Sequence, residues 1–188
     1  MKCDKAFLRN KFLLLRKRKY LTAKKFNFNL IFGLIKKHFQ GKKITIGGYY
    51  PSNYEVNILK FLQEATKKKF RITLPVIKSS NKMSFKLWVF KEPLYVNKFG
   101  ILEPKNSKKK IIPDLIIVPL LVFDNKLNRI GYGRGYYDRS LKEISRIKKN
   151  TISLGIAYSF QKYKKIPAKK HDFKLNYIFT EKGIINSN

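Results

Sequence analysis

The stretch of sequence that indicates the fold is Asp114-Leu-Ile-Ile-Val-Pro-Leu-Leu-Val-Phe-Asp-Asn-Lys-Leu-Asn-Arg-Ile-Gly-Tyr-Gly-Arg-Gly-Tyr-Tyr-Asp-Arg139. Its first part, Asp114 to Pro119, is an almost continuous apolar run, which is typical of a parallel strand buried on both faces. A glycine-rich loop follows, and the next residues predict a helix from about Asp138 to Lys148. A buried strand, a glycine-rich turn and a helix in this order point to an α/β protein.

The same alternation of strands and helices extends in both directions from this stretch. Hydrophobic periodicity predicts helices over residues 5–19, 27–39 and 55–68 and strands over residues 44–46, 72–77, 84–90, 151–158 and 175–180. Ser52 or Asn53 is expected to cap the helix that starts at Glu55. Residues 91–110 are interpreted as a connecting loop. The pattern predicts one domain over residues 1–188, a Rossmann-like three-layer sandwich with a mostly parallel sheet flanked by helices.

The composition combines a globular hydrophobic share with an unusual charge. Hydrophobic residues make up 44% of the chain, and 43 Lys+Arg against 11 Asp+Glu give a formal net charge of +32. A surface of this charge attracts polyanions, and nucleic acid is the first candidate. However, the positive residues are spread along the whole chain, and the sequence contains no zinc-ligand spacing, helix-turn-helix signature or RNA-recognition aromatic motif. Only non-specific electrostatic binding to nucleic acid is therefore expected, and compositional drift explains the charge equally well.

Other features of the sequence bear on where in the cell the protein is expected. Cys3 is the single cysteine, so no intramolecular disulfide can form. The first twenty residues are rich in charge and lack the apolar region of a signal peptide. The longest apolar stretch, Leu115 to Phe123, is too short to span a bilayer. We expect a cytoplasmic monomer without membrane contact.

The glycine-rich loop has the composition of a phosphate site. Gly131, Gly133 and Gly135 alternate just before the predicted helix, and glycine lets main-chain N–H groups approach a ligand closely. Arg129 and Arg134 are suited to bidentate contacts with phosphate oxygens. A carboxylate next to bound phosphates implies a bridging metal, so Asp138 in this loop suggests Mg²⁺.

The loop matches neither of the two common nucleotide motifs. It lacks the lysine of the usual phosphate loop, and its third glycine comes one position too early for the dinucleotide fingerprint. One alternative is a glycine-rich strand-to-helix turn that merely exposes two arginines. Another keeps the phosphate site but assigns a different anionic substrate, such as a phosphosugar.

The residues 118–124 and 129–138 together resemble the signature of the 5-formyltetrahydrofolate cyclo-ligase family. Weaker blocks are similar to the family in the same order and spacing, and the resemblance covers nearly the whole chain. These blocks are Lys5-Ala-Phe-Leu-Arg9, Tyr50-Pro51 with Glu55, Leu74-Pro75, Met83-Ser-Phe85, Gly100 with Glu103-Pro104, Pro167 with His171-Asp172, and Thr180-Glu181.

The resemblance implies an ATP-dependent reaction. Family members phosphorylate the formyl oxygen of 5-formyltetrahydrofolate, and N10 then displaces phosphate to close the ring of 5,10-methenyltetrahydrofolate. By this resemblance, Lys5 and Arg9 contact the ATP phosphates, and Arg134 and Tyr136 take the catalytic roles. The ATP-binding loop then consists of Arg129, Ile130, Gly131, Tyr132, Gly133, Arg134, Gly135, Tyr136 and Tyr137. Without the resemblance, Lys5 and Arg9 are expected to be a solvated helix face.

The resemblance also implies folate and metal ligands. The residues expected to contact the folate are Arg9, Tyr50, Glu55, Phe99, Gly133 and Gly135, and those expected to hold Mg²⁺ are Asp138 and Asp172. Glu55 suits the adjacent N–H donors of a pterin edge, but it also suits the first turn of a helix. Asp172 is equally suited to cap a turn, and Phe99 to fill the core. The strong positive charge is suited to substrates with polyglutamate tails.

Two positions depart from the family pattern. Asn176 stands where many relatives have an acidic residue, which puts a supporting role in metal binding in doubt there. Arg134 stands where glycine is common, although a basic residue also occurs, and it adds affinity for phosphate.

Overall fold

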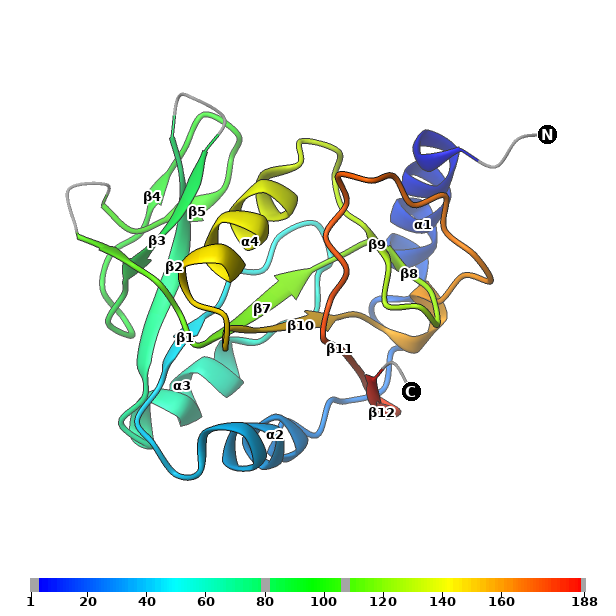
Figure 1. The fold of residues 1–188 in the computed structure, drawn as a ribbon. Coiled ribbons are helices and arrows are strands. Elements are labelled where there is room, and N and C mark those ends of the chain that lie inside the picture. The colour runs from blue at the N-terminus through cyan, green and yellow to red at the C-terminus, as the bar shows by residue number, and fades with distance from the viewer. Residues whose placement is uncertain (1–3, 79–81, 106–108, 187–188) are drawn as a thin grey trace.

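An eight-stranded mixed sheet runs through the middle of the molecule (Figure 1). Figure 1 is drawn from a computed structural model that describes residues 4–78, 82–105 and 109–186. The order of the strands across the sheet is β12 (Gly183–Asn186), β11 (Tyr177–Thr180), β10 (Ile152–Ile156), β7 (Leu115–Pro119), β1 (Thr45–Gly47), β2 (Arg71–Ile77), β3 (Met83–Leu87) and β6 (Lys110–Ile111). Five neighbouring strands, β11, β10, β7, β1 and β2, are parallel. On one side β12 is antiparallel to β11, and on the other β3 is antiparallel to both of its neighbours, β2 and β6.

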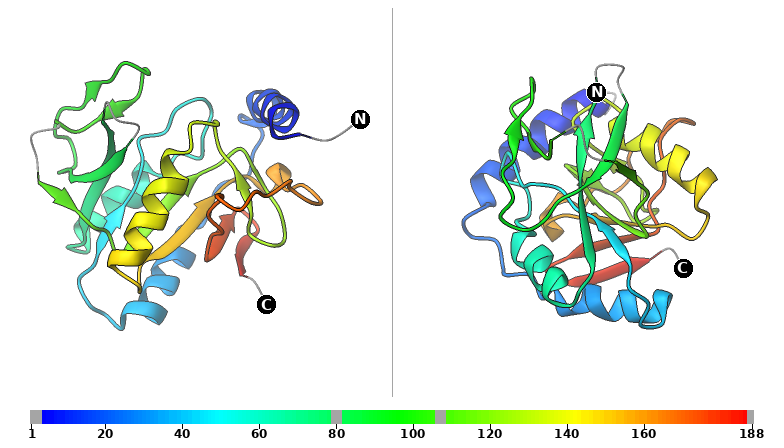
Figure 2. Two further views of the ribbon diagram at one scale, coloured as in Figure 1. Left: turned by 45° about the horizontal axis from the view of Figure 1, so that its top comes forward. Right: turned by 90° about the vertical axis from the view of Figure 1, so that its left-hand side faces the viewer.

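Helices cover both faces of this sheet (Figure 2). Alternate residues of β7 point to opposite layers: Leu115 and Ile117 pack with α2 (Asn29–Phe39) and α3 (Leu59–Lys67), while Ile116 and Val118 pack with α4 (Tyr136–Ile147). All four side chains are buried, which explains why this strand has no polar alternation. The prediction of a three-layer α/β sandwich with a mostly parallel sheet is confirmed.

The first helix lies outside the sandwich. Helix α1 (Lys5–Lys19) packs on the hairpin of β8 (Val122–Phe123) and β9 (Arg129–Ile130) through a small separate apolar cluster. Asp4 caps this helix, because its carboxylate accepts a hydrogen bond of 2.7 Å from the Phe7 N–H. The predicted bounds of residues 5–19 are confirmed.

One predicted helix begins later than expected. Helix α3 starts at Leu59 and not at Glu55, so Ser52 and Asn53 do not cap it. Asn53 and Tyr54 have φ angles of 47° and 61°, a left-handed conformation that directs the chain away from a helix. The side chain of Asn57 instead accepts a hydrogen bond from the Leu59 N–H.

Smaller differences concern short elements that hydrophobic patterns rarely reveal. Strand β3 (Met83–Leu87) ends three residues before the predicted end at residue 90. Helix α4 begins at Tyr136, two residues before its predicted start. The predicted loop over 91–110 contains a two-stranded ribbon of β4 (Tyr95–Val96) and β5 (Leu102–Glu103), and its last residue, Lys110, begins β6. The β8–β9 hairpin, β12 and the 3₁₀ turn η1 (Ser159–Gln161) were not predicted. Within the described ranges, no helix combines the length and apolarity needed to cross a bilayer.

Candidate active site

A cleft of about 1130 Å³ opens at the carboxyl edge of the sheet, where ligands of α/β proteins usually bind. Its walls include Tyr49 to Glu55 after β1, the end of β2 and Pro119 at the end of β7. Every site residue predicted from the sequence lines this cleft. These residues are Lys5 and Arg9 from α1, Tyr50, Glu55, Phe99, the segment from Arg129 to Asp138, and Asp172.

The glycine-rich loop presents an open helix N-terminus to the cleft. Gly135 takes the cap position of α4 with φ 66° and has no side chain with which to cap the helix. The N–H groups of the first helical turn lack intrahelical acceptors, and the helix dipole makes this end positive. Gly133 has φ 97°, and a Cβ there would lie 3.2 Å from the Arg9 guanidinium carbon. The loop is therefore shaped to bind an anion.

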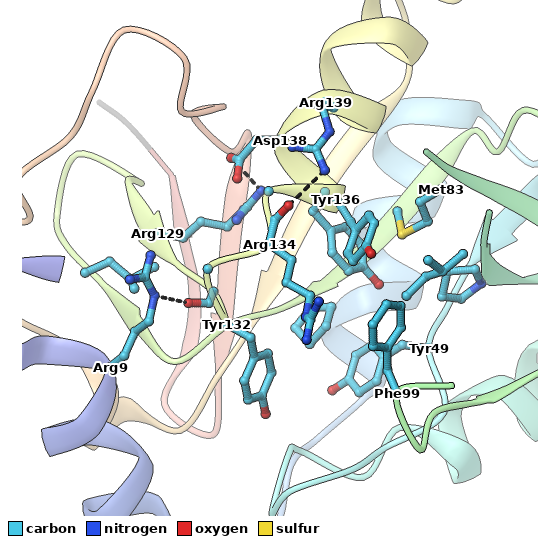
Figure 3. Close-up of a pocket in the computed structure, with 18 of the residues that line it drawn as sticks. Arg9, Tyr49, Met83, Phe99, Arg129, Tyr132, Arg134, Tyr136, Asp138 and Arg139 are labelled. Atoms are coloured by element: carbon cyan, nitrogen blue, oxygen red, sulfur yellow. Dashed lines mark hydrogen bonds and ion pairs between the residues drawn. The ribbon is translucent and has the colours of Figure 1, made fainter. Parts of the chain in front are cut away.

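Two arginines brace this loop from the helices beside it (Figure 3). Arg9 Nε donates to the Gly131 carbonyl at 2.9 Å, and Arg139 Nη2 donates to the Arg134 carbonyl at 2.8 Å. The first contact joins α1 to the loop, and the second joins the loop to α4. Because both arginines also line the cleft, they add positive charge where an anion would lie.

Two carboxylates lie together at one end of the cleft. Asp138 Oδ1 accepts hydrogen bonds from Arg129 Nη2 at 2.9 Å and from the Phe173 N–H at 3.0 Å. Asp172, the neighbour of Phe173 in the chain, accepts from Lys5 Nζ at 2.5 Å and from the Lys169 N–H at 2.6 Å. Burial disfavours the charged form of Asp172, but the Lys169 N–H and the Lys5 ammonium outweigh it and lower its pKa.

These two carboxylates do not by themselves make up a complete set of metal ligands. The part of the chain that the structure describes contains no group of three or more His, Cys, Asp or Glu side chains able to share one ion. Mg²⁺ is commonly held by one or two carboxylates together with substrate phosphates and water. Asp138 and Asp172 therefore fit an Mg²⁺ ion that arrives with a phosphate ligand.

Aromatic and cationic side chains meet in the middle of the cleft. The Arg134 guanidinium carbon lies 4.3 Å from the centroid of the Phe99 ring, and the rings of Phe99 and Tyr136 are 6.2 Å apart (Figure 3). Contact of this kind between a cation and an aromatic face is attractive. Phe99 thus lies across the cleft from the glycine-rich loop, partly exposed, and does not fill the core.

Glu55 forms a buried acidic position in the cleft wall, beside Tyr132 of the glycine-rich loop. Only 6% of the residue is exposed, and its Oε2 accepts a hydrogen bond of 3.0 Å from the Ser52 N–H. Burial raises the pKa of Glu55 above the ordinary 4.5, and the Ser52 N–H, the Arg16 charge and a hydrogen bond with Tyr132 partly offset it. The alternative of a first-turn helix residue is wrong, because α3 begins four residues later.

The raised pKa of Glu55 predicts a pH-dependent difference in stability. A carboxyl group with a raised folded-state pKa stabilises the fold below 4.5, and this contribution is lost as the pH rises through the folded-state pKa. The free energy of unfolding of Glu55→Gln minus that of the unchanged protein is therefore expected to increase with pH over this window. Urea unfolding at a series of pH values measures it, and a flat or falling difference contradicts the prediction.

The structure adds residues that the sequence did not single out for the site. Arg16 of α1 is 1% exposed and lies beside Tyr132 and Glu55. Its helical spacing from Lys5 and Arg9 was a usable signal, because positions 5, 9 and 16 share one face of a helix. Arg139 also lines the cleft, although its place in the first turns of α4 gave no sequence signal.

Asn176 lies away from the cleft. Its side-chain oxygen accepts hydrogen bonds of 2.8 Å from both the N–H and the hydroxyl of Ser153. It directly precedes β11, at the amino edge of the parallel strands, whereas the cleft is at their carboxyl edge. The departure from the family pattern at this position therefore leaves the proposed metal ligands untouched.

Comparison with known proteins gives a consistent result. A family model described as the 5-formyltetrahydrofolate cyclo-ligase family matches residues 1–181. The 5-formyltetrahydrofolate cyclo-ligase of Haemophilus influenzae is 31% identical over 142 residues, which are 72% of this chain and 74% of that protein.

Two solved structures resemble the whole molecule. The structure of Aquifex aeolicus 5,10-methenyltetrahydrofolate synthetase superposes with a TM-score of 0.73 and 29% identity, covering 97% of this chain and 92% of that chain. A 5,10-methenyltetrahydrofolate synthetase from Mycoplasma pneumoniae is 24% identical and superposes with a TM-score of 0.69. The superposition covers 99% of this chain and 100% of that chain, and it shows that the two proteins share a fold.

Proposed function

This chain belongs to the 5-formyltetrahydrofolate cyclo-ligase family, and we propose that its cleft performs the reaction of that family with the residues described above. The reaction is the ATP-dependent conversion of 5-formyltetrahydrofolate to 5,10-methenyltetrahydrofolate. Transfer of the γ-phosphoryl group makes the formyl oxygen a leaving group. N10 then bonds to the formyl carbon and loses its proton, and the C–O bond breaks to release phosphate.

The nucleotide end of the cleft is assigned to the glycine-rich loop and α1. The open N-terminus of α4 would bind the ATP phosphates through main-chain N–H groups. Lys5, Arg9 and Arg129 line the same end and would neutralise the phosphate charge. Catalysis of phosphoryl transfer depends mainly on such positioning and charge neutralisation.

Asp138 and Asp172 are the proposed Mg²⁺ ligands. Both carboxylates lie beside the phosphate end, and each is paired with a cation, Asp138 with Arg129 and Asp172 with Lys5. A bound Mg²⁺ ion would neutralise the charge that develops on the transferred phosphoryl group. When ATP arrives, Lys5 is free to turn from Asp172 to the phosphates, because it reaches the cleft from the end of a helix.

Arg134 and Tyr136 are assigned to the transfer step itself. Arg134 extends from the phosphate loop to Phe99, so its guanidinium lies between the proposed nucleotide and folate ends. In this position it would stabilise negative charge that passes from ATP to the formyl oxygen. Tyr136 packs against Phe99 at the start of α4 and would help to position the formyl group.

The folate end is assigned to Tyr50, Glu55 and Phe99. Both Phe99 and Glu55 line the cleft. Phe99 is assigned to stack on a ring of the folate, and Glu55 is assigned to accept hydrogen bonds from its polar edge, because a carboxylate suits adjacent N–H donors. Gly133, Gly135 and Arg9 line the boundary between the two ends and would contact both substrates. The end of β2 and Met83 supply apolar surface for the remaining rings.

One observation carries this proposal: the open N-terminus of α4, the two carboxylates of Asp138 and Asp172, and the buried Glu55 all line one cleft. The test is the absorbance of the methenyl product, followed with purified protein, 5-formyltetrahydrofolate, Mg²⁺ and ATP. Growth that requires both ATP and protein supports the proposal. Folded protein that binds ATP but forms no product contradicts it and favours another anionic substrate on the same fold.

We further propose that the positive surface favours polyglutamylated substrate. The net charge is +32, and Lys98 and Lys169 line the cleft itself. Electrostatic attraction of this kind is screened by salt. The KM for a substrate with a long polyglutamate tail is expected to be lower than that for a single glutamate at low salt, with the difference shrinking at high salt. Equal KM values at low salt contradict this.

A further inference from the structure

Arg16 joins three separate segments beneath the cleft. It is 1% exposed, and its Nη2 donates a hydrogen bond of 2.6 Å to the Asn53 carbonyl and another to the Tyr132 hydroxyl. Its Nη1 lies 3.4 Å from the Leu120 carbonyl. Among the described residues its Nε has no hydrogen-bond partner, although it is buried. Burying a charged side chain with incomplete partners costs desolvation energy and contributes little to stability. The burial of Arg16 therefore points to a role in the site.

The segment that Arg16 contacts after β1 is a strained turn. Asn53 and Tyr54 both have positive φ angles, of 47° and 61°, which side chains disfavour. Such strain persists only where surrounding contacts enforce it, and it is concentrated at functional sites. The turn closes with a 2.9 Å hydrogen bond from the Glu55 N–H to the Ser52 carbonyl. This turn brings Glu55 to the cleft. The hydrogen bond from Arg16 to the Asn53 carbonyl holds the turn in place.

The charge of Arg16 also acts on Glu55. The groups that face Glu55 are Arg16 from α1, Ser52 from its own turn, Tyr49 after β1, Tyr132 from the glycine-rich loop and Tyr137 from α4. Of these groups, Arg16 carries the positive charge. Burial alone disfavours the carboxylate, and it raises the pKa of Glu55 despite Arg16.

We propose that Arg16 is a positioning residue for the folate end: by holding the Asn53–Tyr54 turn and the Tyr132 hydroxyl, it keeps the Glu55 carboxylate directed into the cleft and negatively charged. This inference rests on the role proposed for Glu55 in folate binding. It adds a link between the two ends of the site, because Tyr132 belongs to the loop assigned to ATP.

The kinetic test compares Arg16→Lys and Tyr132→Phe with Arg18→Lys, an exposed arginine on the same helix. Lysine keeps the charge but cannot donate to three acceptors in one plane. We expect Arg16→Lys to raise the KM for 5-formyltetrahydrofolate about 10- to 100-fold, as for loss of hydrogen bonds to a charged group. The KM for ATP is expected to change much less, and Tyr132→Phe is expected to act in the same direction. Arg18→Lys is expected to match the unchanged protein.

A second readout needs no activity. Titration of the Glu55 carboxyl carbon by ¹³C NMR in the ligand-free protein, assigned with Glu55→Gln, reports its ionisation directly. In Arg16→Met, the pKa of Glu55 is expected to rise above that of the unchanged protein. If Arg16→Met does not fold, Tyr132→Phe gives the same comparison, because it removes the hydroxyl between Arg16 and the carboxylate.

The outcomes separate this inference from the proposed function. Equal increases in both KM values, or a Glu55 titration unchanged in the variants, overturn the role of Arg16. If the unchanged protein forms no methenyl product, the proposed function fails. The titration then still decides whether Arg16 keeps Glu55 ionised, and a shifted titration retains that part of the inference.

Discussion

Arg134→Ala is expected to lower kcat about 100- to 1000-fold, the usual effect of removing one charge-stabilising donor from a transition state. The guanidinium carbon lies 4.3 Å from the Phe99 ring centroid, between the open end of α4 and the folate end. Alanine removes positive charge from the path of the phosphoryl group and leaves the fold intact, because Arg134 is exposed. The rate of methenyl absorbance at saturating substrates measures kcat.

A matched control makes this prediction specific. Arg146→Ala removes an exposed arginine from the last turn of the same helix, away from the cleft, and is expected to keep full activity. Arg134→Lys is expected to fall between the two, because lysine keeps the charge but loses the planar fork. An Arg134→Ala enzyme with an unchanged kcat and a raised KM for ATP would instead assign Arg134 to binding alone.

Asp138→Ala is expected to reduce the free energy of unfolding by about 3 kcal/mol, the lower range for removing one partner of a buried ion pair. The lower range applies because the Asp138 side chain is 21% exposed, whereas Arg129 is 3% exposed. The variant leaves the Arg129 guanidinium buried, with a pKa already lowered by burial. Urea unfolding measures the loss.

A double variant separates this structural cost from the proposed metal role. Arg129→Met/Asp138→Ala replaces the pair with apolar groups and is expected to regain much of the lost stability, since such replacements are often neutral. It is expected to remain inactive, because neither the carboxylate nor the arginine can act on the phosphates. Activity in the stable double variant would show that Asp138 serves the fold and not the Mg²⁺ ion.

The sequence predicted the centre of the fold well because the physics there is local and strong. The apolar run at β7 has no polar alternation, and its alternate side chains are buried in two separate layers. The glycines at 131, 133 and 135 mark a turn that other residues cannot easily form, since Gly133 and Gly135 have positive φ angles. These signals also located most of the cleft, because the carboxyl edge of a parallel sheet collects its loops.

Features that depend on distant contacts could not be predicted in this way. The late start of α3 follows from the left-handed Asn53 and Tyr54, and Arg16, from another part of the chain, donates to the Asn53 carbonyl in this turn. The hydrophobic pattern of α1 explains Leu8 and Phe12, and helical spacing puts Arg16 on the face of Lys5 and Arg9, but neither predicts that Arg16 is buried. The partners of Asn176 lie in a neighbouring strand, so its distance from the cleft became clear only from the register of the sheet.

The separate packing of α1 has a consequence for how the molecule loses its site. Helix α1 is held by a small apolar cluster around Leu8 and Phe12, apart from the two clusters that flank the sheet, and by the polar contacts of Lys5, Arg9 and Arg16. Segments with few apolar contacts open locally at a lower free energy than the whole fold. Detachment of α1 would remove Lys5, Arg9 and Arg16 together while the sheet stays intact. Such opening would leave a folded molecule without a complete site, and bound ATP would disfavour it by linkage.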